Sequence, residues 1–325
     1  MMKFQSRIPE ILGIKYPIIQ AAMSWMTDAK LVAAVSNAGG LGMLGPHAGQ
    51  TTNPTSTEEV IDRMRAEIRK IKALTDKPFA VPVYISENPA VIEPMKQLLL
   101  EEKVPVVLIN VVLDPELFRT FKEAGVKIIY RAYNPTIESS KEAERLGADV
   151  IVTTGFDEGG SVPSNPIGTF SAISHIADAV NIPVMATGGI ADIRGVRATF
   201  VLGAEGVYIG TAFLATEESR MAENVKQMLV DMTAEDQMIF RINMLNSFYR
   251  SLPTQLAHKM VAEDNTDPVR GEKAQALMQG TVGMRIGMLE GDLENGYISV
   301  GNGITYIKEI RPVKALIDDL MQDFI

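Results

Sequence analysis

Cysteine is absent from the 325-residue sequence, and its absence removes several kinds of chemistry at once. Disulfides, thiolate nucleophiles, iron–sulfur clusters and cysteine-ligated zinc are all excluded. Histidine is scarce as well: His47, His175 and His258 share no spacing typical of metal ligands, so we predict no metal site. Basic residues number 31 against 40 acidic ones, a net charge of −9 at pH 7. This balance offers no basic footprint to a nucleic-acid backbone, so we expect no nucleic-acid partner.

Long apolar runs are also missing. The most apolar stretch, residues 104–113, is interrupted by Pro105 and Asn110 and falls far short of the ~20 residues that span a membrane. The first residues, MMKFQSRIPEI, lack the apolar core of a signal peptide. Hydrophobic residues still make up 46% of the chain, enough for a folded core. We therefore expect a cytoplasmic protein that does not insert into membranes.

The first two-thirds of the chain alternates short apolar runs with longer amphipathic segments. Continuous apolarity within a run is typical of parallel strands buried on both faces. Between the runs, Ser56 with Glu59 predicts a capping box, and Asp114 before Pro115 predicts a helix start. Eight strand–helix units favour an α/β fold, a closed (β/α)8 TIM barrel, with a doubly wound sheet as the alternative. The runs span residues 17–20, 41–44, 79–85, 106–112, 127–132, 149–153, 183–186 and 206–209.

After about Thr216 this alternation ends. Residues 221–285 have a helical pattern, and 10 of the 18 methionines lie between Met221 and Met321. These methionines either fill a helical core or form a flexible apolar cover over a site for an apolar small molecule. No Gly/Ser/Pro-rich linker sets this part apart, so we expect a lid packed on the barrel. The predicted parts are a barrel (1–218), a mostly helical lid (219–300) and a C-terminal segment (301–325) that packs back on the barrel.

Two glycine-containing loops predict a phosphate site. In a TIM barrel the chemistry lies on the loops that follow the strands, and a phosphate is often bound after strands seven and eight. Here Gly188 and Gly189 follow the seventh run, and Gly210 and Thr211 follow the eighth. Glycine lets the backbone approach closely, and N–H groups at helix starts face a dianion. The alternative is two ordinary glycine turns.

Two further loops reach the same end of the barrel. The loop after the sixth run contains Asp157 and Glu158, which either handle protons or form a solvated acidic turn. The loop after the first run, residues 20–25, is small and apolar at its tip. It is suited to presenting backbone N–H groups to a flat ring.

With these loops in place, the chain resembles the nitronate monooxygenase (2-nitropropane dioxygenase) family. That family also includes the FMN-dependent enoyl-acyl-carrier-protein reductase II and NADH:quinone reductases. The resemblance begins at residues 16–23, YPIIQAAM, and is strongest over 182–192, IPVMATGGIAD, and 202–213, LGAEGVYIGTAF. Residues 278–292 and 300–303 are similar to the family's C-terminal pattern.

The resemblance implies an FMN cofactor whose phosphate lies in the two glycine loops. It also implies that the loop after the first strand passes along the isoalloxazine ring. Arg131 falls where quinone reductases of the family have a lysine near the flavin, and a cation there would stabilise the reduced ring. The expected flavin-binding residues are Ala21, Ala22, Met23, Arg131, Gly159, Gly160, Gly188, Gly189, Gly210 and Thr211. The candidate catalytic residues are Ser161, Asp157 and Arg131.

Three departures from the family pattern limit what is carried over. The loop after strand six usually ends in G-G-H, but here Gly159 and Gly160 are followed by Ser161. The family's strand-three asparagine aligns with Pro82, and its QGGM is QAAM at residues 20–23. A serine donates a hydrogen bond but is no base near pH 7 without a partner, so histidine-dependent proton transfer is not expected here.

Three functions remain open from the sequence. An FMN oxidoreductase that oxidises alkyl nitronates with dioxygen is favoured, because a preformed nitronate is already deprotonated and needs no base. An FMN reductase using NAD(P)H on enoyl thioesters or quinones is disfavoured by the missing histidine, if that reaction needs a proton donor. A non-redox phosphate-ligand-binding barrel is disfavoured by a resemblance that covers nearly the whole chain. We expect a small-molecule substrate; NAD(P)H as a partner and a homodimer stay open.

Overall fold

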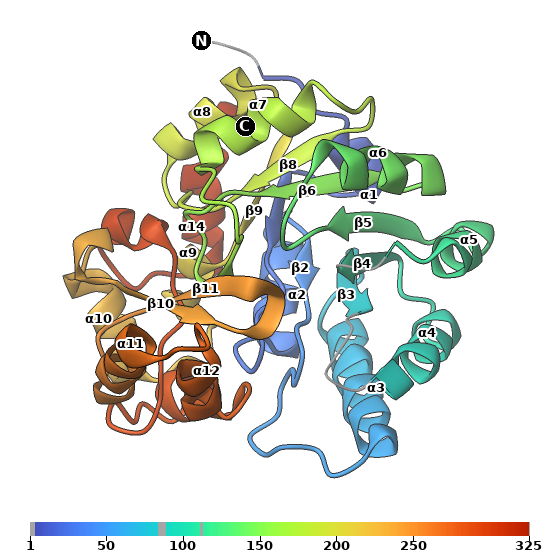
Figure 1. Cartoon of the computed structure of the whole chain (residues 1–325). Helices are drawn as coiled ribbons and strands as arrows, with labels where there is room; N and C mark the ends of the chain where they lie inside the picture. The colour runs from blue at the N-terminus through green and yellow to red at the C-terminus, as the bar shows by residue number, and fades with distance from the viewer. Residues whose placement is uncertain (1–3, 84–88, 111–112, 325) are drawn as a thin grey trace.

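Eight parallel strands form a barrel at the centre of the molecule (Figure 1). The computed structural model describes residues 4–83, 89–110 and 113–324. Neighbouring strands follow the order β1-β9-β8-β6-β5-β4-β3-β2, and a parallel bridge between Ile19 and Leu41 joins β1 to the start of β2. The predicted TIM barrel is confirmed, although residues 84–85 and 111–112 of the expected strands lie outside the described residues. The barrel strands are β1 (Ile18–Gln20), β2 (Gly42–Met43), β3 (Phe79–Val83), β4 (Val106–Asn110), β5 (Lys127–Arg131), β6 (Val150–Thr154), β8 (Val184–Thr187) and β9 (Gly206–Ile209).

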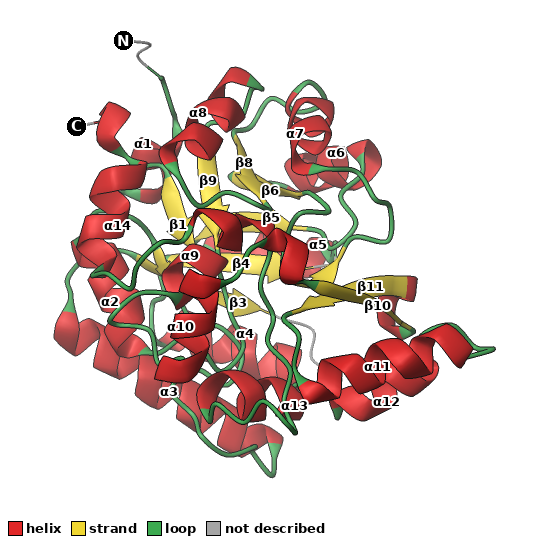
Figure 2. Cartoon of the chain, turned by 90° about the vertical axis from the view of Figure 1, so that its left-hand side faces the viewer, coloured by secondary structure: helices red, strands yellow, loops and turns green. Residues whose placement is uncertain are grey.

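Helices connect the strands and cover the outside of the barrel (Figure 2). The Ser56 hydroxyl accepts the N–H of Glu59 at 3.1 Å, but the Glu59 carboxylate bonds to Thr55 N–H, so only half of the predicted capping box forms. Asp114 caps its helix as predicted, accepting the N–H of Glu116 at 2.9 Å. These helices are α2 (Ala29–Asn37), α3 (Thr57–Leu74), α4 (Ile92–Glu101), α5 (Pro115–Glu123), α6 (Ile137–Leu146), α7 (Thr169–Ala177), α8 (Ile193–Val201) and α9 (Thr211–Leu214).

Side chains fill the barrel interior and close its N-terminal end. Ile19 and Leu108 point into one buried cluster with Ile8 and Leu12 of the short helix α1 (Ile8–Leu12). Ile8 lies against the start of β9, where a Cβ on Gly206 would come within 2.9 Å of its Cδ1. Because this end is plugged, the carboxyl ends of the strands are left for a ligand, as in other barrels.

A three-stranded antiparallel sheet lies over the barrel mouth. It consists of β7 (Gly160–Val162), β10 (Met238–Ile242) and β11 (Ser247–Ser251). The predicted helical pattern over residues 221–285 is therefore wrong for the β10–β11 hairpin. Its short apolar runs do not distinguish a strand from a buried helix by periodicity. Pairing with the distant β7, which places Ser161 opposite Tyr249, decides in favour of strands.

The lid (219–300) also contains several helices, and the C-terminal helix α14 (Val313–Leu320) packs on the barrel. Val313 and Ile317 are buried in one cluster with Leu31 of α2 and Val196 of α8. The domain boundaries at residues 218 and 300 stay a prediction. The lid helices are α10 (Glu223–Asp231), α11 (Gln255–Thr266), α12 (Glu272–Met278), α13 (Val282–Met284) and a π-helical turn (Arg285–Leu289). Short 3-10 turns span Pro89–Val91, Ala234–Asp236, Met244–Asn246, Asn302–Tyr306 and Gln322–Phe324. None of the described helices is long and apolar enough to cross a membrane.

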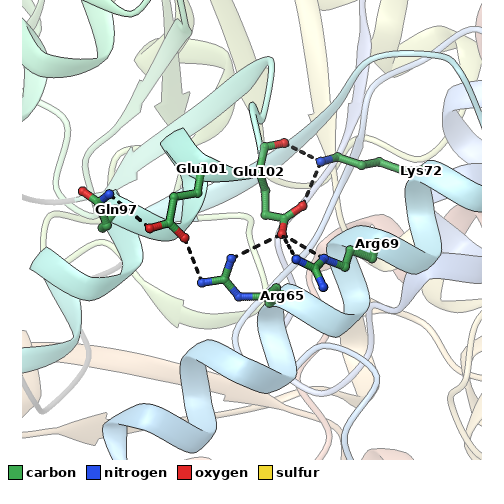
Figure 3. A network of polar contacts seen from close by, with 6 residues as sticks. All are labelled: Arg65, Arg69, Lys72, Gln97, Glu101 and Glu102. Atoms are coloured by element: carbon green, nitrogen blue, oxygen red, sulfur yellow. Dashed lines mark hydrogen bonds and ion pairs between the residues drawn. The ribbon is translucent and has the colours of Figure 1, made fainter.

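Helices α3 and α4 are joined by an ion-pair network (Figure 3). Glu102 at the end of α4 accepts hydrogen bonds from Arg65, Arg69 and Lys72 at 3.3, 2.9 and 3.0 Å. Its side chain is 9% exposed, whereas that of Glu101, which pairs with Arg65, is 45% exposed. Burial opposes ionisation of Glu102, but its hydrogen bonds from Lys72 and Arg69 outweigh burial, so its pKa lies below the ordinary value. Glu102 is therefore the centre of this network.

We expect Glu102→Ala to lower the free energy of unfolding by about 1–3 kcal/mol, because three cations lose their shared acceptor. The matched control, Glu101→Ala, should cost at most about 1 kcal/mol, as an exposed pair does. Urea denaturation measures both. The Glu102 contribution is present above the ordinary carboxyl pKa of about 4.3 and is lost as the pH falls through its lower folded pKa. Equal losses in the two variants would contradict the central role of Glu102.

Candidate active site

A cavity of about 360 Å³ lies between the barrel mouth and the lid. This volume is within the ~300–1,000 Å³ typical of small-molecule sites. The barrel contributes the loops after β1, β6, β8 and β9, and the lid contributes the three-stranded sheet, α12 and α13. Of the residues expected to bind flavin, all line this one cavity: Ala21, Ala22, Met23, Arg131, Gly159, Gly160, Gly188, Gly189, Gly210 and Thr211.

The two glycine loops come together with a third glycine-containing segment, residues 301–303, that was not predicted to lie at the site. Gly188 and Gly189 have φ angles of +112° and +71°, which favour glycine. Gly210 begins α9 without a capping side chain. Gly301, from the C-terminal segment, donates its N–H to the Thr211 hydroxyl at 3.0 Å, and Gly303 also lines the cavity. The result is a cradle of backbone with little side-chain bulk.

The loop after β1 forms another wall of the cavity, but the N–H groups of Ala21 and Ala22 already have acceptors. Ala21 donates to the carbonyl of Ile209 at 2.8 Å, and Ala22 donates to the Tyr208 hydroxyl at 2.9 Å. The expectation that these N–H groups are presented to a flat ring therefore does not hold for Ala21 and Ala22. What the loop offers instead is a small apolar surface with Met23 beside it.

Arg131, at the end of β5, and Glu158, in the loop after β6, form a buried ion pair in the cavity wall. Nη2 of Arg131 donates to Oε2 of Glu158 at 2.6 Å, and their side chains are 13% and 10% exposed. Burial alone would lower the pKa of Arg131, but attraction to Glu158 outweighs it and keeps the guanidinium charged. Burial raises the pKa of Glu158 above its ordinary value, even though Arg131 pulls it down. From the sequence, Glu158 was expected either to handle protons or to belong to a solvated acidic turn, and its pairing with Arg131 was not predicted.

The structure separates Asp157 from Ser161. Ser161 lines the cavity from β7, but Asp157 is not among the lining residues. The Asp157 carboxylate accepts the N–H of Thr169 at 2.8 Å and the Nδ2 amide of Asn302 at 2.9 Å. Burial acts against ionisation, but these bonds lower the pKa of Asp157 below its ordinary value. Asp157 thus joins the start of α7 to the C-terminal segment, and its expected proton-handling role is not carried forward.

A sequence model of the nitronate monooxygenase family matches residues 5–323, almost the whole chain. The chain belongs to the nitronate monooxygenase family. The resemblance found in the sequence is confirmed. The protein is therefore a flavin-dependent oxidoreductase that acts on a small molecule.

Relatives of this nitronate monooxygenase family member have more than one activity. A probable nitronate monooxygenase of Staphylococcus saprophyticus is 32% identical, covering 82% of this chain and 84% of that protein. A (3aS,4S,5R,7aS)-5-hydroxy-7a-methyl-1-oxo-octahydro-1H-indene-4-carboxyl-CoA dehydrogenase of Rhodococcus jostii is 29% identical, and the match covers 100% of this chain and 97% of that protein. The structure of FabK from Thermotoga maritima is similar with a TM-score of 0.85 at 34% identity, and the match covers 98% of this chain and 96% of that one. A nitroalkane oxidase from Streptomyces ansochromogenes, 23% identical with a TM-score of 0.80, shows the shared fold.

Several cavity residues of this family member were not predicted. Tyr133 follows β5 and Tyr208 belongs to β9, and both rings lie near the Arg131 guanidinium, at 5.5 and 5.7 Å. Tyr249 comes from β11 and bonds to the hydroxyl of Ser299. Their positions depend on the lid sheet and on barrel closure, so no local motif marks them. Four methionines, Met244, Met278, Met284 and Met288, also line the cavity, which agrees with an apolar cover.

We expect Asp157→Ala to lower the free energy of unfolding by about 1–3 kcal/mol, because the N–H of Thr169 and the amide of Asn302 lose their acceptor. Asp157→Asn, which keeps one acceptor oxygen, should lose less. Thermal or urea denaturation measures the effect. The contribution of the carboxylate is present above the ordinary pKa of about 3.9 and is lost as the pH falls through the lower folded pKa. A stable alanine variant with a loss of activity above a hundredfold would instead make Asp157 catalytic.

Proposed function

We propose that the cavity binds FMN and that the protein oxidises alkyl nitronates with dioxygen. The assignment of FMN as the cofactor is supported chiefly by one observation. The Gly188–Gly189, Gly210–Thr211 and Gly301–Gly303 segments meet at one cavity, and Arg131 lines the same cavity. The glycine backbone suits a terminal phosphate, because N–H groups can approach a dianion without side chains between them. The adjacent apolar wall from Ala21 to Met23 suits a flat ring. Bound FMN would supply electron transfer between the substrate and dioxygen.

The remaining tasks fall to the side chains of the cavity. Arg131 would place positive charge beside the ring, and the methionines of the lid would exclude water from an apolar substrate chain. Ser161 can donate a hydrogen bond to a nitro oxygen and so orient the substrate. No histidine lines the described cavity. This composition suits a nitronate, which arrives already deprotonated and requires no base.

Reduction of an enoyl thioester by NAD(P)H is the second candidate. It is favoured by the 34% identity to FabK over 98% of the chain and by the relative whose name includes a carboxyl-CoA dehydrogenase. Anaerobic mixing with NADH and with NADPH, followed by a panel of nitronates, enoyl thioesters and quinones in air, distinguishes the two. Bleaching of the flavin by a nicotinamide together with enoyl turnover would select the reductase. Oxygen uptake with nitronates and no nicotinamide oxidation would select the monooxygenase.

We expect the protein to purify with noncovalent FMN and Gly189→Asp to lose it. The substitution adds a negative charge to the loop proposed to hold the phosphate, at a φ of +71° that favours glycine and with a Cβ 3.1 Å from that of Asp157, so the loop must also shift. Each charged hydrogen bond to the phosphate contributes about 1.5–3 kcal/mol, so lost bonds should strip the flavin on dilution. Gly189→Ala is the control, since it adds the same Cβ without the charge and should retain more flavin. The flavin-to-protein absorbance ratio after gel filtration is the measurement. Full occupancy in the aspartate variant would disprove the phosphate site.

Ser161→Ala should reduce nitronate oxidation by at most about tenfold, or ~1.4 kcal/mol, the size expected for one neutral hydrogen bond. The shape of the pH–rate profile should be the same in both proteins, because serine does not titrate in this range. No transition should be assignable to a histidine, whose unperturbed pKa is about 6.5. Steady-state rates from acid to alkaline pH on one nitronate test this. A loss of several hundredfold would show that Ser161 is activated and essential.

A further inference from the structure

The Arg131–Glu158 ion pair uses only part of the hydrogen-bonding capacity of each group. A single contact, Nη2 to Oε2 at 2.6 Å, joins them. Nε of Arg131 and Oε1 of Glu158 are buried and have no hydrogen-bond partner among the described residues. Both side chains line the cavity that we assign to FMN. The pair is therefore held in the cavity wall with one donor and one acceptor unused.

Charged and titratable groups face this pair from four sides. Tyr133 follows β5 and Tyr208 comes from β9, on the Arg131 side. Arg250 comes from β11 and donates from Nε to the backbone carbonyl of Glu158 at 3.0 Å. Asp157 precedes Glu158 and attracts Arg250. Two guanidinium groups thus stand against two carboxylates, and the cluster is neutral while both acids are ionised.

Additional negative charge in this cavity would upset the balance. An arginine does not release its proton in a protein, so it cannot adjust. Asp157 is held in its ionised form by the bonds to Thr169 and Asn302. Glu158 is the group able to respond, since a second negative charge nearby in a medium of low polarity favours the neutral form of a carboxyl. Burial already raises the pKa of Glu158, which supports this assignment.

We propose that Glu158 is a positioning residue that acts through Arg131: it takes up a proton when the bound flavin is reduced. Once Glu158 is neutral, it no longer balances the charge of Arg131, and the guanidinium becomes the counter-charge of the reduced ring. This inference rests on the proposed FMN site but not on the substrate. Two electrons and one proton pass to the ring from the reductant and solvent, and one further proton from solvent forms the O–H bond of the Glu158 carboxyl. The electrons come from the substrate in turnover and from dithionite in the test.

The test compares the midpoint potential of the FMN-loaded protein with that of Glu158→Gln as a function of pH. One additional proton per reduction changes the equilibrium tenfold per pH unit, which is about 30 mV for a two-electron couple. We expect the wild-type potential to fall more steeply than that of the glutamine variant by this amount per pH unit. The curves should meet at low pH, where Glu158 is protonated in both redox states, and separate as the pH rises, with the variant higher.

Two further variants serve as controls. Glu158→Asp keeps a carboxyl group and should restore the steeper slope. Arg131→Met should also lose it, because an unpaired buried Glu158 is neutral already in the oxidised state. The midpoint potential of Arg131→Met should lie below that of Glu158→Gln, because in the glutamine variant the charge of Arg131 is not balanced by a carboxylate. Removing Arg131 alone is therefore expected to change the potential less than removing a lone cation would.

A second readout is the number of protons taken up during anaerobic dithionite reduction in weakly buffered solution with an indicator dye. The wild type should take up one proton more than Glu158→Gln at a pH where the two potentials diverge. Parallel potential curves across the range in which buried carboxyls titrate, up to about pH 9, would overturn the proposal. Equal proton counts in the two proteins would also overturn the proposal. If the glutamine variant failed to fold, the wild-type count alone would decide, and an uptake no greater than the ring itself requires would overturn the proposal. Failure to oxidise nitronates would leave these results unaffected, whereas a colourless protein would refute the FMN site.

Discussion

The loop after β6, residues 155–161, holds the barrel, the lid sheet and the C-terminal segment together at one point. Arg250 of β11 donates to the carbonyls of Phe156 and Glu158, and Asn302 donates its N–H to the carbonyl of Asp157 at 2.9 Å. The backbone of this loop approaches that of the C-terminal segment so closely that a Cβ on Gly159 would lie 2.2 Å from a backbone carbon of Val300. Only glycine fits there, and Gly159 itself lines the cavity. At this point of the barrel mouth the three parts are therefore in direct backbone contact.

The conformation of the loop after β6 also determines which of its two acidic side chains reaches the cavity. Asp157 and Glu158 are neighbours in the chain, but the side chain of Asp157 points toward α7 and Asn302, whereas that of Glu158 points toward Arg131. One acid therefore stabilises the scaffold and keeps its charge, and the other lies where its charge affects the site. Because both are fixed by the backbone of one loop, a change that loosens the loop is expected to alter stability and cavity electrostatics together.

The sequence was most informative where a residue's role depends on its neighbours in the chain. Continuous apolar runs predicted all eight barrel strands because burial on both faces leaves little room for polar residues. Gly188 and Gly189 were singled out because they directly follow the seventh apolar run, where barrels often bind a phosphate, and their positive φ angles agree with a requirement for glycine. The β10–β11 hairpin was missed because its third strand, β7, lies some 75 residues before it (Gly160–Val162 against Met238–Ile242). The partnership of Glu158 with Arg131 was missed for a similar reason, since it depends on the adjacency of β5 and β6 in the barrel.

Glu158 also offsets the desolvation cost of burying the Arg131 guanidinium in the cavity wall before any cofactor binds. An arginine so deeply buried without a partner would carry a desolvation cost of several kcal/mol, and breaking a buried pair typically costs about 3–5 kcal/mol. The pair permits the flavin-free chain to fold with the guanidinium already in the cavity wall. A lone cation would favour the reduced ring more strongly, but at the expense of this stability. A carboxyl that is ionised during folding and able to accept a proton later satisfies both requirements, because it neutralises Arg131 only while no other negative charge is present.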